Sequence, residues 1–227
     1  MSDTTSPTTR AIVGIKLLRR LFAHHANTGT TGSALAQELA HIVAQLDFRA
    51  KRQDRAQSEP EQVPFDAIPL PVAPHPVTQH FLPKPQSHAN DIPTPDTLFN
   101  TFQPLLQSLP WRYGYTPRAD VPGLENRMAW AELIGPVAPW RSDKLCLGLT
   151  AIAPQTRYPE HAHPAVEVYY VLSGNALWTA DGVTCTRPPG SFILHPSGTI
   201  HVMETRAEAL LAVYTWSGDV HSPSVYT

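Results

Sequence analysis

Two histidines, a glutamate and a tyrosine stand close together in the run YPEHAHPAVEVYYVLSG, residues 158–174. Side chains two residues apart in a β-strand point to the same face, so His161 and His163 can point into a barrel together. Glu167 and Tyr169 form a second same-face pair, and the proline between the pairs lets the chain bend. Imidazole nitrogens with one carboxylate suit a borderline divalent ion, namely Zn, Fe(II), Mn, Co or Ni.

A second run, GSFILHPSGTIH, supplies a further candidate ligand. Residues 190–201 read G-x5-P-x-G-x2-H, in which Pro196 and Gly198 build a tight turn. A strand that begins after this turn can point His201 inward. The alternative is a barrel whose histidines are ordinary hydrogen-bonded core residues. The predicted metal ligands are three imidazoles and one carboxylate: His161, His163, Glu167 and His201.

Strand-like segments surround both runs and must position these residues. From about residue 128 the chain alternates between apolar segments and turns with Gly, Pro, Asp or Asn, which is typical of an antiparallel barrel or double-sheet roll. The expected strands lie in RMAWAELIG, KLCLGLTAIAP, EVYYVLSGNALWTAD, GSFILHP and ALLAVYTWSG. Residues 128–227 are therefore predicted to form a mainly β barrel around the metal ligands.

The first 127 residues are predicted to form an extension. Apolar residues at spacings of three and four predict a helical hairpin over residues 1–50, with Ser33 capping its second helix. Residues 51–127 begin with a Pro-rich strap, because ten prolines between Pro60 and Pro95 exclude regular helix, and continue with a short helix in PDTLFNTFQPLLQSLP. The strap has apolar residues to bury against the barrel: Phe65, Ile68, Leu70, Val72, Phe81 and Leu82.

Composition narrows the class of partner. A formal charge of -2 on 227 residues gives no electrostatic reason to expect nucleic acid or an anionic membrane. No apolar run approaches the roughly 18 residues that span a bilayer. Two cysteines, Cys146 and Cys185, provide no disulfide framework, and free thiols are favoured over a single bridge. We expect a cytoplasmic protein whose partner is neither a nucleic acid nor a membrane. Whether it forms a homodimer, in which the helices cap a partner's barrel, stays open.

The two runs together match the paired motifs of the cupin family, HxH(x)3E(x)6G and G(x)5PxGxxH. The matching residues are His161, His163, Glu167 and Gly174, then Gly190, Pro196, Gly198 and His201. Two departures occur: Gln155 stands where the family has a glycine ahead of the first histidine, and Thr205 replaces the asparagine that ends the second motif. This resemblance implies a cupin barrel, a double-stranded β-helix or jelly roll, with an α-helical N-terminal extension.

The tyrosines carry a more specific resemblance. The pattern Y-x2-H-x-H-x3-E-x-Y resembles the cupin-type dimethylsulfoniopropionate (DMSP) lyases, the DddL, DddQ and DddW group, as does YTWSG near the C-terminus. The resemblance implies a metal-dependent β-elimination that releases dimethyl sulfide and acrylate, with Tyr169 as general base and Tyr158 as the second catalytic residue, lining the pocket. Aromatic faces suit the sulfonium cation of the substrate. The predicted substrate-binding residues are Tyr158, Tyr214, Trp216 and Trp178.

Neighbouring residues receive structural roles. Tyr170 alternates to the face opposite Tyr169 and should pack outward. For three aromatic residues a packing role is favoured over closure of the barrel mouth, namely Trp111, Tyr113 and Tyr115. His195, which precedes the proline turn, is given no part in the site.

Three alternative functions stay open. An Fe(II)-dependent cupin oxygenase would use the same ligands but needs no phenolic base. An isomerase of sugar phosphates or keto acids would need Lys or Arg near the site to hold an anion. A non-enzymatic metal-binding cupin with a sensory or storage role would need neither a phenolic base nor a cationic side chain near the site. The sequence does not identify the metal, nor does it show whether DMSP is the best substrate.

Overall fold

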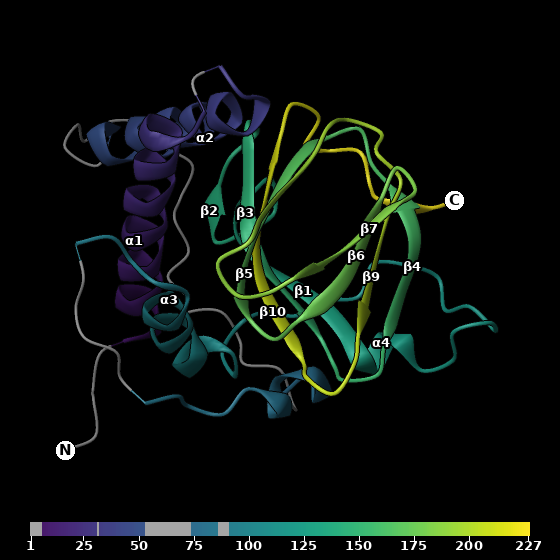
Figure 1. Ribbon diagram of the computed structural model, residues 1–227. Helices are drawn as coiled ribbons and strands as arrows, with labels where there is room; N and C mark the ends of the chain where they lie inside the picture. The colour runs from purple at the N-terminus through teal and green to yellow at the C-terminus, as the bar shows by residue number, and fades with distance from the viewer. Residues whose placement is uncertain (1–5, 31, 53–73, 86–90) are drawn as a thin grey trace.

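The strands of the computed structural model, which describes residues 6–30, 32–52, 74–85 and 91–227, form two facing sheets (Figure 1). Neighbouring strands are antiparallel except for the short β1–β2 pair. The first sheet contains, in order, β2 (Trp140–Arg141), β1 (Met128–Gly135), β3 (Leu145–Ile152), β10 (Leu210–Ser217), β5 (Val166–Ser173) and β8 (Phe192–His195). The second contains β11 (Val225–Tyr226), β4 (Arg157–Ala162), β9 (His201–Thr205), β6 (Ala176–Ala180) and β7 (Val183–Arg187). The predicted mainly β fold is confirmed.

Helices cover one side of this barrel, as Figure 1 shows. The first two described helices are α1 (Pro7–Thr28) and α2 (Ala34–Arg52), which pack against each other as the predicted hairpin. Ser33 caps α2 as predicted, because its hydroxyl accepts a hydrogen bond from the Ala36 amide at 3.2 Å. No helix in the described ranges is long and apolar enough to cross a membrane.

Between the hairpin and the barrel, the described residues form only short helices. These are the 3-10 helix η2 (Pro76–His80), α3 (Pro95–Phe102), the 3-10 helix η3 (Gln103–Leu105) and α4 (Leu124–Arg127). The predicted short helix is confirmed, and its regular α-helical part ends ahead of Pro104. β1 begins at Met128, where the barrel was expected to start, although the division into a hairpin, a strap and a barrel stays a prediction.

The Pro-rich strap is only partly described. Its predicted apolar residues Phe65, Ile68, Leu70 and Val72 lie outside the described residues. Phe81 is buried, but Leu82 is 75% exposed, so the expectation that Leu82 buries its side chain is wrong. Consecutive residues of an extended segment point to opposite sides, and only one of the two can face the core.

Two apolar cores result from the alternation of side chains along β5. Val168, Tyr170 and Leu172 pack in the core shared with α1, α2 and α3, while Tyr169 and Val171 face the interior of the barrel. The prediction that Tyr170 packs outward is confirmed. Both cysteines are free: Cys146 is buried in the interior core and Cys185 is half-buried on β7.

Three positions in or near the two motifs show how backbone geometry and hydrogen bonds determine which residues fit there. Gly174 has φ 81°, and a Cβ at this position would lie 2.0 Å from the Ala209 carbonyl oxygen, so only glycine fits. Gln155 takes the place of a motif glycine and also adopts a left-handed conformation, with φ 52°. Thr205 replaces an asparagine and uses its hydroxyl to accept from the Thr156 amide at 3.0 Å and to donate to the Ala153 carbonyl at 2.6 Å.

Candidate active site

Three strands and one turn position the predicted metal ligands. His161 lies near the end of β4, His163 follows it, Glu167 lies in β5 and His201 begins β9. His161 and His201 are direct partners in the ladder between β4 and β9. The proline turn is tied to the first motif, since the Gly198 amide donates to the His163 carbonyl at 2.9 Å. Backbone hydrogen bonds therefore hold the two motifs together.

Three of the four predicted ligands form a tight buried group. Glu167 Oε2 lies 3.0 Å from His163 Nε2 and 3.3 Å from His201 Nε2. One ligand atom from each of these residues lies within 4.8 Å of the other two. His161 stands beside this group and is not part of it: its ring lies 4.0 Å from the His201 ring and is stacked on Tyr158 at 3.8 Å.

Hydrogen bonds at Nδ1 prepare the histidines to bind a cation. The Nδ1 atoms of His161, His163 and His201 lie 2.8 Å, 3.0 Å and 2.9 Å from backbone carbonyl oxygens, which can only accept, so each Nδ1 carries its proton. In a neutral ring Nε2 then carries a lone pair, and the Nε2 atoms of His163 and His201 face Glu167, which suits a metal-binding imidazole. His201 Nε2 is buried and has no hydrogen-bond partner among the described residues.

The electrostatics of the group also require a positive charge. Burial holds the pKa of His161 well below its usual value, with the neighbouring His201 adding to the effect. Burial is the largest single influence on His163 and acts against its protonation, but the hydrogen bond to Glu167, the charge of that carboxylate and backbone hydrogen bonds together outweigh burial and raise the pKa of His163. Lone pairs and a carboxylate oxygen repel one another unless a cation or an extra proton lies between them. The donor set fits a divalent metal ion.

Glu167 has further partners that the sequence did not predict. Trp216 Nε1 donates to Oε1 at 2.8 Å, and His195 Nδ1 lies 3.2 Å from Oε2. His195 is fully buried at the end of β8, directly opposite Glu167 in the β5–β8 ladder. Period-two alternation could have found it, because His195 shares a face with the interior residue Ile193.

Tyr169 faces the same cavity as these ligands and is 4% exposed. Burial raises the pKa of its phenol well above the usual value, and the Glu167 carboxylate raises it further, while a hydrogen bond to Thr150 lowers it. The phenol is therefore neutral unless positive charge is supplied nearby. Thr150, in β3, is a second residue of the site that the sequence did not predict.

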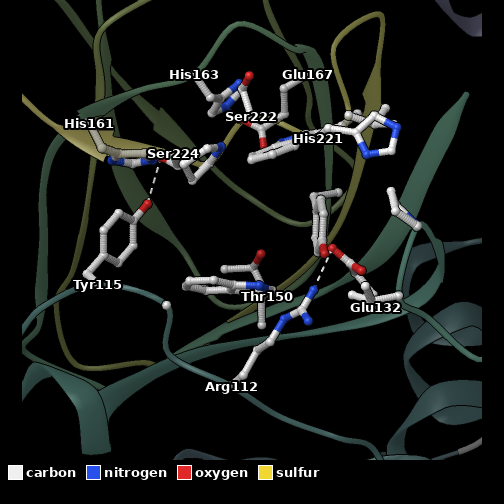
Figure 2. Close-up of a pocket in the computed structure, with 18 of the residues that line it drawn as sticks. Arg112, Tyr115, Glu132, Thr150, His161, His163, Glu167, His221, Ser222 and Ser224 are labelled. Carbon is white, nitrogen blue, oxygen red and sulfur yellow. Dashed lines mark hydrogen bonds and ion pairs between the residues drawn. The ribbon is translucent and has the colours of Figure 1, made fainter. Parts of the chain in front are cut away.

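The cavity has a volume of about 430 Å³ and two chemically different ends. Figure 2 shows His163 and Glu167 on one side and Arg112 and Glu132 on the other. Arg112 Nη2 lies 2.8 Å from Glu132 Oε1 in an ion pair that the sequence did not predict. The aromatic walls include three of the four predicted substrate-binding residues: Tyr158, Tyr214 and Trp216.

Trp178, the fourth, is not among the described residues that line the cavity. Its side chain is buried, and its indole N–H donates to His195 Nε2 at 3.1 Å. The ring also packs edge-on against Tyr169 at 4.8 Å. Trp178 thus lies behind the wall of the cavity.

A cluster of phenols closes one side of the cavity. Tyr115 lines it, hydrogen-bonds to the Tyr158 hydroxyl and donates to Ser224 Oγ at 2.7 Å. Tyr113 bonds instead to the Tyr226 hydroxyl at 2.7 Å, and Trp111 packs against the outer core. Tyr115 therefore has both roles that were weighed for it, because it packs against the interior core and also lines the cavity. Its partner Ser224 follows the last long strand and is brought to the mouth by the tertiary fold.

Comparisons with known proteins agree with this geometry. The dimethylsulfoniopropionate lyase family matches residues 49–212. Dimethylsulfoniopropionate lyase DddQ of Ruegeria pomeroyi is 29% identical over 177 residues, which cover 74% of this chain and 87% of that protein. The crystal structure of DMSP lyase DddQ from Ruegeria pomeroyi DSS-3 has a TM-score of 0.58 at 26% identity, covering 83% of this chain and 96% of that chain. A chain from the crystal structures of the DMSP lyases RdDddP and RnDddQII has the same fold, with a TM-score of 0.61 at 24% identity over 94% of this chain and 99% of that chain.

Proposed function

Because the chain belongs to the dimethylsulfoniopropionate lyase family, we propose that it cleaves DMSP to dimethyl sulfide and acrylate by a metal-dependent β-elimination. The observation that carries this proposal is one cavity that exposes both a histidine–carboxylate group and the phenol of Tyr169. An elimination of this kind needs one base and one site that stabilises negative charge. The cavity offers a candidate for each.

His163, Glu167 and His201 are the ligands we assign to the metal, with His161 beside them as the fourth predicted ligand. Zn, Fe(II), Mn, Co and Ni all suit this donor set. When bound, such a cation supplies positive charge that neutralises the substrate carboxylate and stabilises the charge developing on it as the neighbouring carbon loses its proton. The same positive charge favours the ionised form of a nearby phenol.

Tyr169 is the general base in this proposal. The phenolate oxygen takes the proton from the carbon next to the substrate carboxylate, and the electron pair of that C–H bond forms the C=C bond of acrylate. The bond from the β carbon to sulfur breaks, and its electron pair leaves with dimethyl sulfide. The sulfonium is a good leaving group and needs no acid. Thr150 stabilises the phenolate through the hydrogen bond that lowers the pKa of Tyr169.

Aromatic faces hold the cationic end of the substrate. A sulfonium has no hydrogen-bond donor, and each aromatic face within reach is worth about 0.5–2 kcal/mol to a cation. Tyr158, Tyr214 and Trp216 line the cavity and are the residues we assign to this role. Trp216 additionally donates to Glu167, so it connects the substrate wall to the proposed metal site.

Headspace detection of dimethyl sulfide tests the proposal directly. Purified protein is incubated with DMSP as prepared, after removal of metal with a chelator, and after return of each of the five metals alone. We expect release to stop with the chelator, to return with at least one metal, and to match acrylate formation one to one. Undiminished release by metal-free protein would exclude the metal, and no release with any metal would exclude the activity.

A further inference from the structure

His195 is the one histidine next to Glu167 that turns Nδ1 toward the carboxylate within the described part of the site. Its Nδ1 lies 3.2 Å from Glu167 Oε2, and its Nε2 lies 3.1 Å from Trp178 Nε1. His195 is 0% exposed, and Trp178 is 1% exposed. Both ring nitrogens are therefore committed to protein partners, away from water.

The indole of Trp178 fixes the tautomer of His195. An indole N–H can only donate, so His195 Nε2 must accept and carries no proton. In the neutral ring the proton then lies on Nδ1, which donates it to Glu167. The three predicted histidine ligands have the same tautomer but are oriented differently, because their Nδ1 atoms donate to backbone carbonyls and not to Glu167. His195 thus offers no lone pair to a metal ion.

Two donors hold the Glu167 carboxylate, one at each of its oxygens. Trp216 Nε1 donates to Oε1 at 2.8 Å, and His195 donates to Oε2. An oxygen that accepts from His195 keeps a second lone pair, which can face His163 and His201. Partners that orient a metal ligand in this way are worth about 10–100-fold in metal affinity.

We propose that His195 is a positioning residue, which orients Glu167 for metal binding and is itself held in the donating tautomer by Trp178. The proposal rests on the proposed function for the metal but concerns residues outside the predicted ligand set. Trp178 thereby acts through His195 and Glu167, in place of the substrate contact expected from the sequence.

Substitutions of His195 can separate its two hydrogen bonds. In His195→Asn the amide nitrogen takes the place of Nδ1 and can still donate to Glu167. In His195→Gln the amide group lies near the former Nε2 and can accept from Trp178, but no donor faces Glu167. His195→Leu removes both bonds. The proteins are stripped of metal, titrated with Co(II) against a chelator of known affinity, and their visible absorption is recorded.

We expect the Asn variant to stay within about threefold of wild-type Co(II) affinity and to keep its absorption band, whereas the Gln and Leu variants lose about 10–100-fold and shift the band. The Co(II) affinity of Trp178→Phe should fall between these limits, because the His195 ring then loses the donor that fixes its tautomer. Thermal unfolding of the metal-free proteins identifies any variant that is not folded. If the Leu variant does not fold, the comparison of the Asn and Gln variants still tests the proposal.

Two results would overturn the proposal. If the Gln variant binds Co(II) like wild type while the Asn variant does not, His195 serves to satisfy Trp178 and has no role in orienting Glu167. If all the folded variants match wild type in affinity and spectrum, His195 has no influence on the metal site. Failure of the wild-type protein itself to bind Co(II) is a separate outcome, which would remove the proposed metal site and this inference together.

Discussion

Glu167 and Glu132 are carboxylates that line the same cavity, yet their surroundings differ. Glu167 has three buried histidines within 3.3 Å of Oε2, and two of these direct lone pairs toward it. Glu132, at the other end, pairs with the fixed positive charge of Arg112, and its Oε2 finds no partner within the described ranges. Glu132 has a fixed counter-charge in the protein, whereas the charge of Glu167 is balanced only by a bound cation or by a proton on a neighbouring histidine such as His163.

This difference indicates which end does chemistry. His163 and Glu167 line the cavity, so a cation that they would hold could also bind a substrate carboxylate there. The charge of Glu132 is largely neutralised by Arg112, whose side chain is 43% exposed and partly screened by water. We therefore assign the reaction to the Glu167 end and a structural role to the Arg112–Glu132 pair.

The largest difference between the two ends should appear when each carboxylate is replaced by its amide. Glu167→Gln removes a proposed ligand, and we expect metal affinity and dimethyl sulfide release to fall by more than about 100-fold, beyond the usual effect of an outer partner. Glu132→Gln should keep its metal, since it removes no ligand. The metal content and the dimethyl sulfide release of both variants are measured. Loss of metal from the Glu132 variant would contradict the assignment of the reaction to the Glu167 end.

A smaller effect should distinguish the two members of the ion pair. Arg112→Met leaves Glu132, which is 13% exposed, without its partner, and we expect it to lower the free energy of unfolding by about 1–3 kcal/mol. Glu132→Gln should cost less, because the Arg112 guanidinium can turn to water. Denaturant unfolding compares the two variants with the double variant Arg112→Met/Glu132→Gln. A double variant less stable than Arg112→Met alone would contradict the assigned role of the pair.

The smallest effect is expected at Tyr214, between the two ends. Its hydroxyl is buried without a hydrogen-bond partner in the described part of the chain. Tyr214→Phe keeps the aromatic face and removes only this hydroxyl, so the free energy of unfolding should change by less than about 0.5 kcal/mol or rise. The same denaturant experiment measures it, and a loss above about 1.5 kcal/mol would show that the hydroxyl has a partner after all.

The sequence predicted the barrel and the core of the site because both depend on local patterns. Period-two alternation assigned Tyr169 to the interior and Tyr170 to the outer face, and both assignments agree with the structure. The two motifs also brought His163, Glu167 and His201 together. The backbone geometry survives even where a motif residue is missing, as the left-handed Gln155 shows.

Other parts of the site depend on contacts between distant segments, which the sequence does not reveal. Arg112 reaches the cavity through an isolated bridge between its own backbone and Trp130. Tyr115 reaches it through a hydrogen bond to Ser224, 109 residues away. His195 was within reach of the alternation argument, but a histidine directly before a turn-forming proline gives no sign that its partner is Glu167.

Release of dimethyl sulfide by Tyr169→Phe tests the central claim most directly, with metal content measured on the same samples. Tyr170→Phe is the matched control, because it loses the same hydroxyl from the adjacent residue on the outer face of β5. If Tyr169 is the base, its variant should bind metal as wild type does and lose about 10²–10⁴-fold in rate, while the control keeps its activity. A metal-loaded Tyr169→Phe enzyme that releases dimethyl sulfide at the wild-type rate would contradict the mechanism.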